Sequence, residues 1–225
     1  MKRLVLFVEG DGDASAVPVL VRRLLTELNA WDSLFLDLNP FVVGGVNRLF
    51  KDDSGNWLRW LGAAAKRGSI GAVLVVLDGD LRRIRGKPFC AANVARELAQ
   101  QSKRARAGDL FSVATVFACQ EYESWLIAGV ESLCGKPLKD GRPGVRPGTQ
   151  PPGQNLELAP RDAKGWLKRV MESGYNPVRD SALLTEIVDF ELIRNRPMRS
   201  FRRLESALST IVGALRNQSH VVSPG

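Results

Sequence analysis

The chain has 225 residues, of which 44% are hydrophobic and 25% are charged, and its formal net charge is +8. These values are ordinary for a soluble protein with one sizeable α/β domain. No apolar run approaches the roughly 18–20 residues that span a bilayer, and the first one stops at Glu9, too early for a signal peptide. We therefore expect a cytoplasmic protein without a membrane partner. Three cysteines outside any C-x-x-C pair and a single histidine, His220, leave almost no material for a zinc site or a histidine-dependent triad.

Strand and helix patterns alternate along the first 134 residues. Residues 3–8 predict a strand, and residues 14–29 predict a helix with Pro18 in its first turn. The next predicted strands are 34–38, 41–43, 72–77 and 111–119, and the next predicted helices are 56–67, 88–106 and 120–128. Alternation at this spacing predicts an α/β fold with a mostly parallel sheet and flanking helices.

The character of the chain changes after Cys134. Residues 135–160 contain five glycines and six of the twelve prolines, which predicts a long surface loop, either a mobile lid or an ordered wrap-around. Helical patterns return at 161–172, 181–188 and 198–215. We therefore expect an α/β core over 1–134, a loop over 135–160, and a helical C-terminal extension over 161–225 that packs on the core.

Two of the predicted strands end in acidic residues. Glu9 follows the first strand, and Asp78 and Asp80 follow the strand 72–77. Ligands of open α/β sheets bind beyond the carboxyl ends of the strands, so these side chains are expected to meet there. Carboxylates about 4 Å apart repel by roughly 1–4 kcal/mol per pair. A divalent cation such as Mg²⁺, or Mn²⁺, would offset that repulsion. The alternative is that the aspartates only cap the following turn.

Three further acidic residues are candidate ligands. Asp13 follows Gly10-Asp11-Gly12, and it is either a metal ligand or the N-cap of the first helix. Glu121 and Glu123 follow the strand 111–119. On a helix these two side chains would point apart, so only one is expected to reach the shared site, and either could instead simply favour the first helical turn. The sequence matches neither the dinucleotide-binding fingerprint nor the P-loop.

Positive charge is concentrated in two segments. Residues 81–108 contain eight basic side chains and one acid, and residues 194–203 contain five arginines and no acid. Such runs are commonly solvated surface, but beside an acidic, metal-competent site they indicate a polyanion such as nucleic acid. The arginines expected to contact it are Arg82, Arg83, Arg85, Arg199, Arg202 and Arg203.

Glu9, Asp78 and Asp80 also carry a resemblance to the TOPRIM domain, the catalytic module of topoisomerases, primases and overcoming-lysogenization-defect nucleases. The nuclease branch has E-G-x-x-E/D at the first site, which corresponds to Glu9, Gly10 and Asp13. More narrowly, the chain resembles a bacterial TOPRIM-like family of unknown function (4276), often encoded beside ATPases in phage-defence loci. This resemblance extends over V-E-G-D-G-D, V-L-D-G-D, Q-E-Y-E-S-W, D-A-K-G-W-L and R-S-F-R-R-L, and so over nearly the whole chain.

The resemblance implies a TOPRIM-like, Rossmann-like sheet and magnesium-dependent cleavage of DNA or RNA. Glu9, Asp78 and Asp80 would be catalytic metal ligands, Asp13 with Glu121 or Glu123 would complete a second site, and Lys164 would stabilise the charge that develops on the phosphate. The chain departs from the family pattern where Arg82 replaces a third aspartate. The alternatives are a non-catalytic nucleic-acid-binding or regulatory partner of an ATPase, and a phosphatase with its nucleophile in D-x-D.

Overall fold

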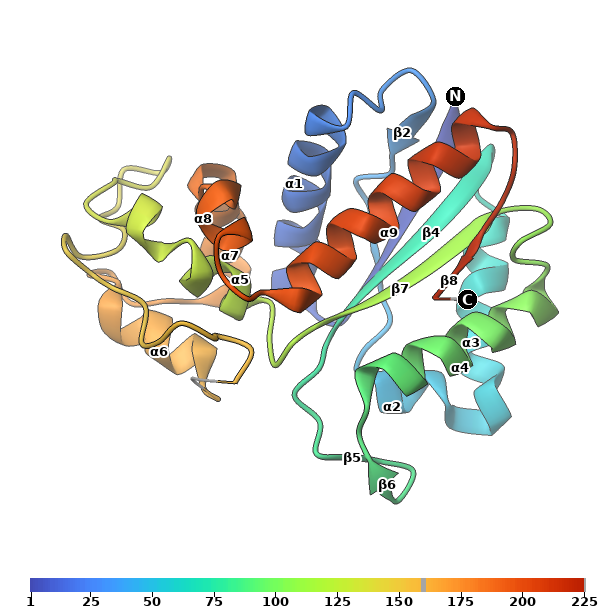
Figure 1. Ribbon diagram of the computed structural model, residues 1–225, viewed down its shortest axis with the longest axis horizontal. Coiled ribbons are helices and arrows are strands. Elements are labelled where there is room, and N and C mark those ends of the chain that lie inside the picture. Colours follow the sequence, from blue (N-terminus) through green and yellow to red (C-terminus); the bar gives the residue numbers. More distant parts are fainter. Residues whose placement is uncertain (159–160, 225) are drawn as a thin grey trace.

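The computed structural model describes residues 1–158 and 161–224, and it shows one parallel sheet covered on both faces by helices (Figure 1). The strand order is β2-β1-β4-β7-β8, and β3 also pairs with β1. Every pairing in this sheet is parallel, so the predicted α/β class is confirmed. The strands are β1 (Lys2–Val8), β2 (Leu34–Leu36), β3 (Phe41–Val42), β4 (Ile70–Asp78), β7 (Ser112–Ala118) and β8 (Val222–Ser223).

The three central strands are continuous apolar runs because both of their faces are buried. Alternate residues of β1, β4 and β7 belong to two different core clusters. Leu4 and Leu74 pack toward α1 (Asp11–Glu27) and α9 (Arg199–Arg216). Val5 and Val73 pack toward α3 (Lys51–Ala65) and α4 (Ala91–Ser102).

The other helices connect or extend these layers. They are α2 (Val46–Leu49), α5 (Glu123–Ala128), α6 (Ala163–Val170), α7 (Pro177–Ile187) and α8 (Phe190–Arg194), with 3₁₀ turns at Lys103–Ala105 and Val130–Leu133. Helices α5 to α8 form a group on the left of Figure 1, beyond the end of β7 that leads into α5. Among the described residues, no helix has both the length and the apolar character that crossing a membrane requires.

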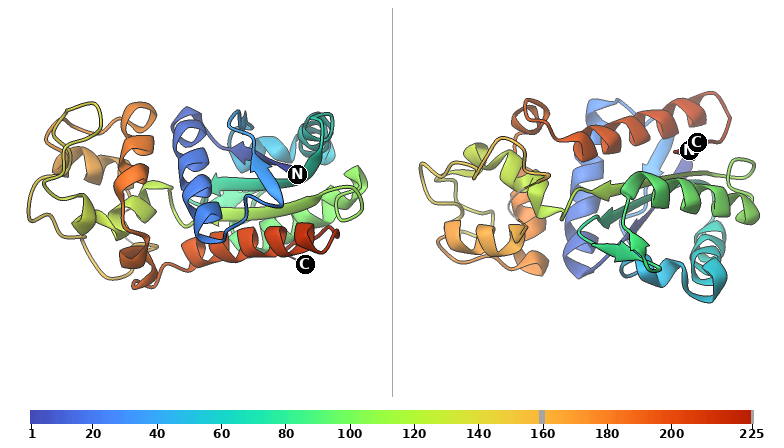
Figure 2. Two further views of the ribbon diagram at one scale, coloured as in Figure 1. Left: turned by 90° about the horizontal axis from the view of Figure 1, so that it is seen from above. Right: turned by 60° about the horizontal axis from the view of Figure 1, so that its bottom comes forward.

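The C-terminal part of the chain enters the layers of the sheet. Helix α9 packs on β7 and β4, and β8 pairs with β7 at Val113 and Ala114 (Figure 2). One apolar cluster contains side chains of β1, α1, α6, α7 and α9 together. The segment 161–225 therefore shares its core with the sheet over its described residues, and residue 225 lies outside them.

Several predicted boundaries shift in the structure. Helix α1 begins at Asp11 rather than at residue 14, because Gly10 is extended (φ −140°) and serves as its N-cap. Helix α5 begins at Glu123 rather than at residue 120, because Gln120 adopts a left-handed conformation (φ +67°) that turns the chain first. The basic loop after β4 contains a small hairpin of β5 (Arg83–Ile84) and β6 (Lys87–Pro88).

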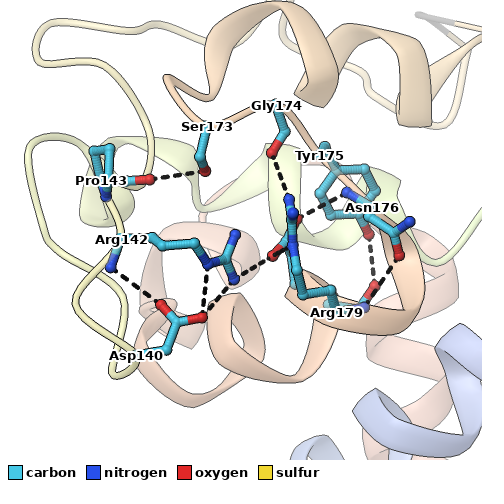
Figure 3. A network of polar contacts seen from close by, with 10 residues as sticks. Asp140, Arg142, Pro143, Ser173, Gly174, Tyr175, Asn176 and Arg179 are labelled. Carbon is cyan, nitrogen blue, oxygen red and sulfur yellow. Dashed lines mark hydrogen bonds and ion pairs between the residues drawn. The ribbon is translucent and has the colours of Figure 1, made fainter.

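The described residues of the glycine- and proline-rich segment, 135–158, contact α7 through Lys139 and Arg142 and the start of α9 through Glu157. Leu138, Val145 and Leu156 are buried, which favours the ordered wrap-around over a mobile lid. Arg142 donates a 2.7 Å hydrogen bond to Asp180, a carboxylate with no solvent exposure. Figure 3 shows the polar network around Arg142, in which Asp140 binds the same guanidinium and Arg179 lies across from it. Residues 159–160 of the predicted loop lie outside the described part.

Helices α1 and α7 touch closely where α1 begins. A methyl group added at Gly12 would lie 2.8 Å from Cβ of Pro177, the first residue of α7. Gly12 therefore permits a contact that any larger residue would block, and this contact lies next to the acidic end of β1.

Candidate functional site

The acidic ends of β1 and β4 meet, as the sequence predicts. Val8 pairs with Val76, so the two strands end at the same edge of the sheet. Oε2 of Glu9 accepts a 3.2 Å hydrogen bond from the backbone N–H of Asp78. The Glu9 carboxylate therefore lies directly against the end of β4.

The glycine between the two aspartates fixes the end of β4. Its N–H donates to the carbonyls of Ala118 (2.8 Å), the last residue of β7, and of Gln120 (3.0 Å), which follows β7. A methyl group at Gly79 would lie 2.8 Å from the Ala118 oxygen, so a larger residue would separate the strand ends. Strand β4 stops at Asp78, and Asp80 is exposed on the next turn.

Asp78 is held by the third acidic strand end. Its Oδ1 accepts a 2.9 Å hydrogen bond from the backbone N–H of Tyr122, and its Oδ2 lies 3.5 Å from Nζ of Lys164. The same ammonium lies 2.7 Å from Oε1 of Glu121 and 3.2 Å from Oε2 of Glu123. Lys164 thus joins three carboxylates that come from two strand ends.

Both glutamates after β7 reach this cluster, so the expectation that they would point apart is wrong. Glu121 precedes α5, whereas Glu123 is its first residue, and the helical spacing does not apply to the pair. Glu121 also accepts a 3.1 Å hydrogen bond from the N–H of Ala163, the first residue of α6. Glu121 therefore fixes the start of α6. Lys164 is the second residue of this helix, so the same contact holds it close to the carboxylates.

Asp13 is partly buried in the same region and has a structural task. Its Oδ2 accepts a 3.1 Å hydrogen bond from the N–H of Gly10, so it belongs to the capping box of α1 at the third helical position and is not the N-cap itself. The other acid of this loop, Asp11, is exposed. Asp13 thus combines helix capping with a position beside the carboxylate cluster.

Burial and mutual repulsion shift the pKa values of this cluster. Burial raises the pKa of Asp13 to about 6, and Glu123 adds to the increase. Burial also raises the pKa of Glu9. It raises the pKa of Asp78 well above its usual range, and the nearby charge of Asp13 is the next largest cause of that increase. Burial alone would lower the pKa of Lys164, but Glu123 and Asp78 raise it, so the ammonium stays charged. Five carboxylates and one ammonium therefore share one half-buried region with an excess of negative charge.

A buried polar network supports the cluster from the side of α7. The hydroxyl of Tyr175 donates to Oε1 of Glu123 (2.9 Å) and lies 2.6 Å from Oγ of Ser181. The hydroxyl of Tyr122 lies 2.7 Å from Oγ1 of Thr185. The sequence does not predict the contact of Tyr175 with Glu123, because this contact depends on how α7 packs.

The oxygen chemistry of the cluster suits a hard cation such as Mg²⁺. Oε2 of Glu123 is buried and has no hydrogen-bond partner among the described residues, although Lys164 is 3.2 Å away. Within the described part of the chain, however, no three histidine, cysteine, aspartate or glutamate side chains are arranged to hold one metal ion. The residues fit a metal by chemistry, but an ion would have to displace the Lys164 ammonium.

The predicted nucleic-acid contacts fall into two groups. In the hairpin loop, Arg83 donates to the Gly86 carbonyl and Arg85 binds Glu97, whereas Arg82 is exposed. At the start of α9, Arg199 is exposed, Arg202 donates to the carbonyl of Arg196, and Arg203 donates to Oγ of Ser223. Arg82 and Arg199 are therefore the two most available of the six.

Asp80 faces a groove that contains basic residues. The groove, of about 560 Å³, is lined by Asp80, Arg82 and Arg161 together with Cys119 and Glu157. The sequence does not predict a binding role for Arg161, because a single arginine beside a proline-rich loop belongs to no recognisable motif. Asp80 still acts on the cluster, since its charge contributes to the raised pKa of Glu9.

Comparison with known proteins identifies the family. A model described as "Domain of unknown function (DUF4276)" matches residues 8–209, which is most of the chain. The chain belongs to the DUF4276 family. Neither curated proteins nor solved structures gave a match. The DUF4276 match includes every strand end described above and Lys164, so the whole carboxylate cluster lies within the family domain.

Proposed function

We propose that this DUF4276 protein is a metal-dependent nuclease of the TOPRIM type that hydrolyses phosphodiester bonds in a bacterial phage-defence system. The observation that carries the proposal is the convergence of Asp78, Glu121 and Glu123 around Lys164 at the carboxyl edge of a parallel sheet, with Glu9 hydrogen-bonded to the end of β4 beside them. The resemblance to TOPRIM nucleases would make Glu9 and Asp78 metal ligands, with Glu121 or Glu123 completing a second site.

The excess of negative charge supports a role for Mg²⁺ or Mn²⁺. Glu9, Asp78 and the two glutamates would hold the ion, with Asp13 and Asp80 next to them. When bound, such an ion supplies Lewis-acid polarisation of a phosphate and lowers the pKa of an attacking water.

Lys164 would have two positions in this proposal. Without substrate, its ammonium neutralises Glu121 and Glu123. With a phosphodiester in place, the same ammonium would turn to the phosphate oxygens and stabilise the charge that develops on them. The exposed Arg82 and Arg161 would hold the neighbouring phosphates of the strand.

Cleavage assays test the proposal directly. Single- and double-stranded DNA and RNA would be incubated with the full chain and Mg²⁺ or Mn²⁺. Glu9→Gln and Asp78→Asn should each lower the rate by about 10²-fold or more, the range that a positioned catalytic group contributes. Asp11→Asn is the matched control, because Asp11 lies between these acids in sequence but is exposed. Unchanged cleavage in the Glu9 and Asp78 variants would remove both residues from the mechanism.

A non-catalytic role is the second candidate, and the position of Lys164 among the carboxylates favours it. In this version the chain binds nucleic acid or a neighbouring ATPase and never cleaves. Inactivity in every cleavage assay, with retained binding to the ATPase, would support it. A protein with six to ten phosphate contacts loses about 10³–10⁵ in affinity between 50 and 200 mM salt, so a flat salt response would argue against nucleic acid in both versions.

A further inference from the structure

A separate pocket of about 490 Å³ lies between α4 and α9, beside β7. Its lining includes Ala91, Ala95, Arg96, Thr115, Arg199 and Arg203. None of the carboxylates that surround Lys164 lines it. The pocket is therefore distinct from the carboxylate cluster, although Gly79 contributes to its wall.

The pocket exists because the last strand is short. Strand β4 pairs with β7 along all seven residues from Ser112 to Ala118, whereas β8 pairs only with Val113 and Ala114. Figure 1 shows β8 beside one end of β7 only, with α9 and α4 on either side of the remaining length. Residues 115–117 of β7 line the pocket at this uncovered edge.

Three guanidinium groups and one carboxylate, Glu157, line the pocket, which gives it a net positive charge. Arg96 and Arg199 are exposed at its rim, and Arg203 is partly buried. None of the three forms an ion pair with a carboxylate in the described part of the chain, and Arg203 has only the hydroxyl of Ser223. Guanidinium groups without an anionic partner favour a phosphate or carboxylate ligand.

Two polar features inside the pocket also point to a ligand. Oγ1 of Thr115 is buried, with the residue 1% exposed, and it has no hydrogen-bond partner among the described residues. Helix α4 begins at Ala91 in the pocket wall without a side-chain cap, so its first N–H groups are available to an anion. At the start of α9, a carboxylate already occupies the equivalent place, because Glu157 accepts a 2.5 Å hydrogen bond from the N–H of Ser200.

We propose that this pocket binds a nucleoside phosphate. The phosphate would lie between Arg96, Arg199 and the start of α4. The nucleoside would lie against the alanines of α4 and Phe117, with Thr115 as a hydrogen-bonding group. The volume is within the range of small-ligand sites, about 300–1,000 Å³. An added peptide strand would also suit the edge of β7, but three guanidinium groups that form no ion pair within the described part of the chain favour phosphate.

The nucleotide has two possible sources, a free nucleotide or one unit of a nucleic-acid strand. The pocket shares Gly79, Ala91, Cys119 and Glu157 with the groove that contains Asp80, Arg82 and Arg161. A strand along both would place one nucleotide in the pocket and its neighbour beside the D-x-D. This strand version rests on the proposed nuclease function, whereas the free-nucleotide version does not.

Isothermal titration in the absence of divalent metal tests the proposal. The full chain would be titrated with the four nucleoside 5′-monophosphates, the corresponding nucleosides and inorganic phosphate. Saturable one-to-one binding of at least one monophosphate, tighter than its nucleoside, is expected. Arg96→Gln and Arg199→Gln should each weaken it about tenfold or more, as loss of a charged hydrogen bond does. Thr115→Val should weaken it without harming the fold, because it removes an unpaired hydroxyl. Arg104→Gln, an exposed arginine beyond α4, is the control.

The outcomes distinguish a free nucleotide from a nucleic-acid strand, and they distinguish this pocket from the proposed nuclease function. A short single-stranded oligonucleotide that displaces the monophosphate, and that binds more weakly to Arg199→Gln, identifies a strand. Displacement by monophosphates alone identifies a free nucleotide. No saturable binding at millimolar concentration, or equal binding in all variants, overturns the inference, as does an extended peptide that binds there instead. Binding that persists in a chain inactive in cleavage leaves this site standing while the nuclease proposal fails.

Discussion

The hydroxyl of Tyr175 donates a 2.9 Å hydrogen bond to Oε1 of Glu123, and it connects the segment before α7 to the carboxylate cluster. Glu123 is only 2% exposed, and its other oxygen faces Lys164. The orientation of this buried carboxylate thus depends on a tyrosine 52 residues away.

Tyr175→Phe should therefore lower both stability and metal affinity. Loss of the hydroxyl leaves Glu123 with an unpaired buried oxygen, which costs about 1–3 kcal/mol in the free energy of unfolding. Chemical denaturation and Mn²⁺ titration would measure the two effects. Tyr122→Phe is the matched control, because that buried hydroxyl contacts Thr185 instead. We expect it to lower stability but to leave Mn²⁺ affinity unchanged, and equal Mn²⁺ affinity in both variants would contradict a positioning role for Tyr175.

Lys164→Met should increase Mn²⁺ affinity while it abolishes cleavage. In the wild-type chain, a metal ion competes with the ammonium that lies 2.7 Å from Glu121 and 3.2 Å from Glu123. Removal of this competitor should tighten binding by about tenfold, or 1.4 kcal/mol. Lys168→Met, an exposed lysine of the same helix, should change neither quantity. Weaker Mn²⁺ binding in the Lys164 variant would show that the lysine does not occupy the place of the metal.

Protonation of Asp13 should stabilise the metal-free fold. Its folded pKa of about 6 exceeds the usual value of 3.8, so the folded state binds the proton more tightly than the unfolded state. The resulting stability is fully present below pH 4 and is lost as the pH rises through 6. Two pKa units correspond to about 2–3 kcal/mol. Asp13→Asn should therefore unfold at higher denaturant concentration than the wild type at pH 8, and the advantage should disappear near pH 4. An advantage independent of pH would argue against Asp13 as the titrating group.

Asp180→Asn should loosen the wrap-around segment. The Asp180 carboxylate has no solvent exposure, and it accepts hydrogen bonds from Arg142 (2.7 Å), Arg179 (2.8 Å) and the N–H of Asn176 (2.8 Å). Burial would raise its pKa, but Arg179, the Asn176 N–H and Arg142 together lower it. Neutralising it leaves Arg179 without its anion and Arg142 with Asp140 alone, at a cost of about 1–3 kcal/mol. Limited proteolysis within 135–158 should accelerate, whereas the exposed Asp109→Asn should behave as wild type.

The sequence predicts the central sheet well because its strands are buried on both faces. Continuous apolar runs identify β1, β4 and β7 within two residues of their observed bounds. Strand β8 and helix α8 are not predicted, because two and five residues carry too little periodic signal. Their conformation is decided by packing against β7 and α9.

The candidate site is only partly predictable for the same reason. Strand ends of a parallel sheet must meet, so the approach of Glu9 to Asp78 follows from the pattern. The pattern does not predict that Glu121 and Glu123 both reach the cluster, because this depends on the left-handed conformation of Gln120. Lys164 was expected from the family resemblance alone, and its position among three carboxylates comes from the docking of α6.

The tight contact between Gly12 and Pro177 limits how the molecule can open. Because Gly12 leaves no room for a larger side chain, the first turns of α1 and α7 pack directly against each other. Entry of a cation into the carboxylate cluster would have to leave this junction of α1 and α7 intact. The Lys164 side chain of α6, which pairs with Glu121 and Glu123, is the group that would have to turn aside while this contact stays in place.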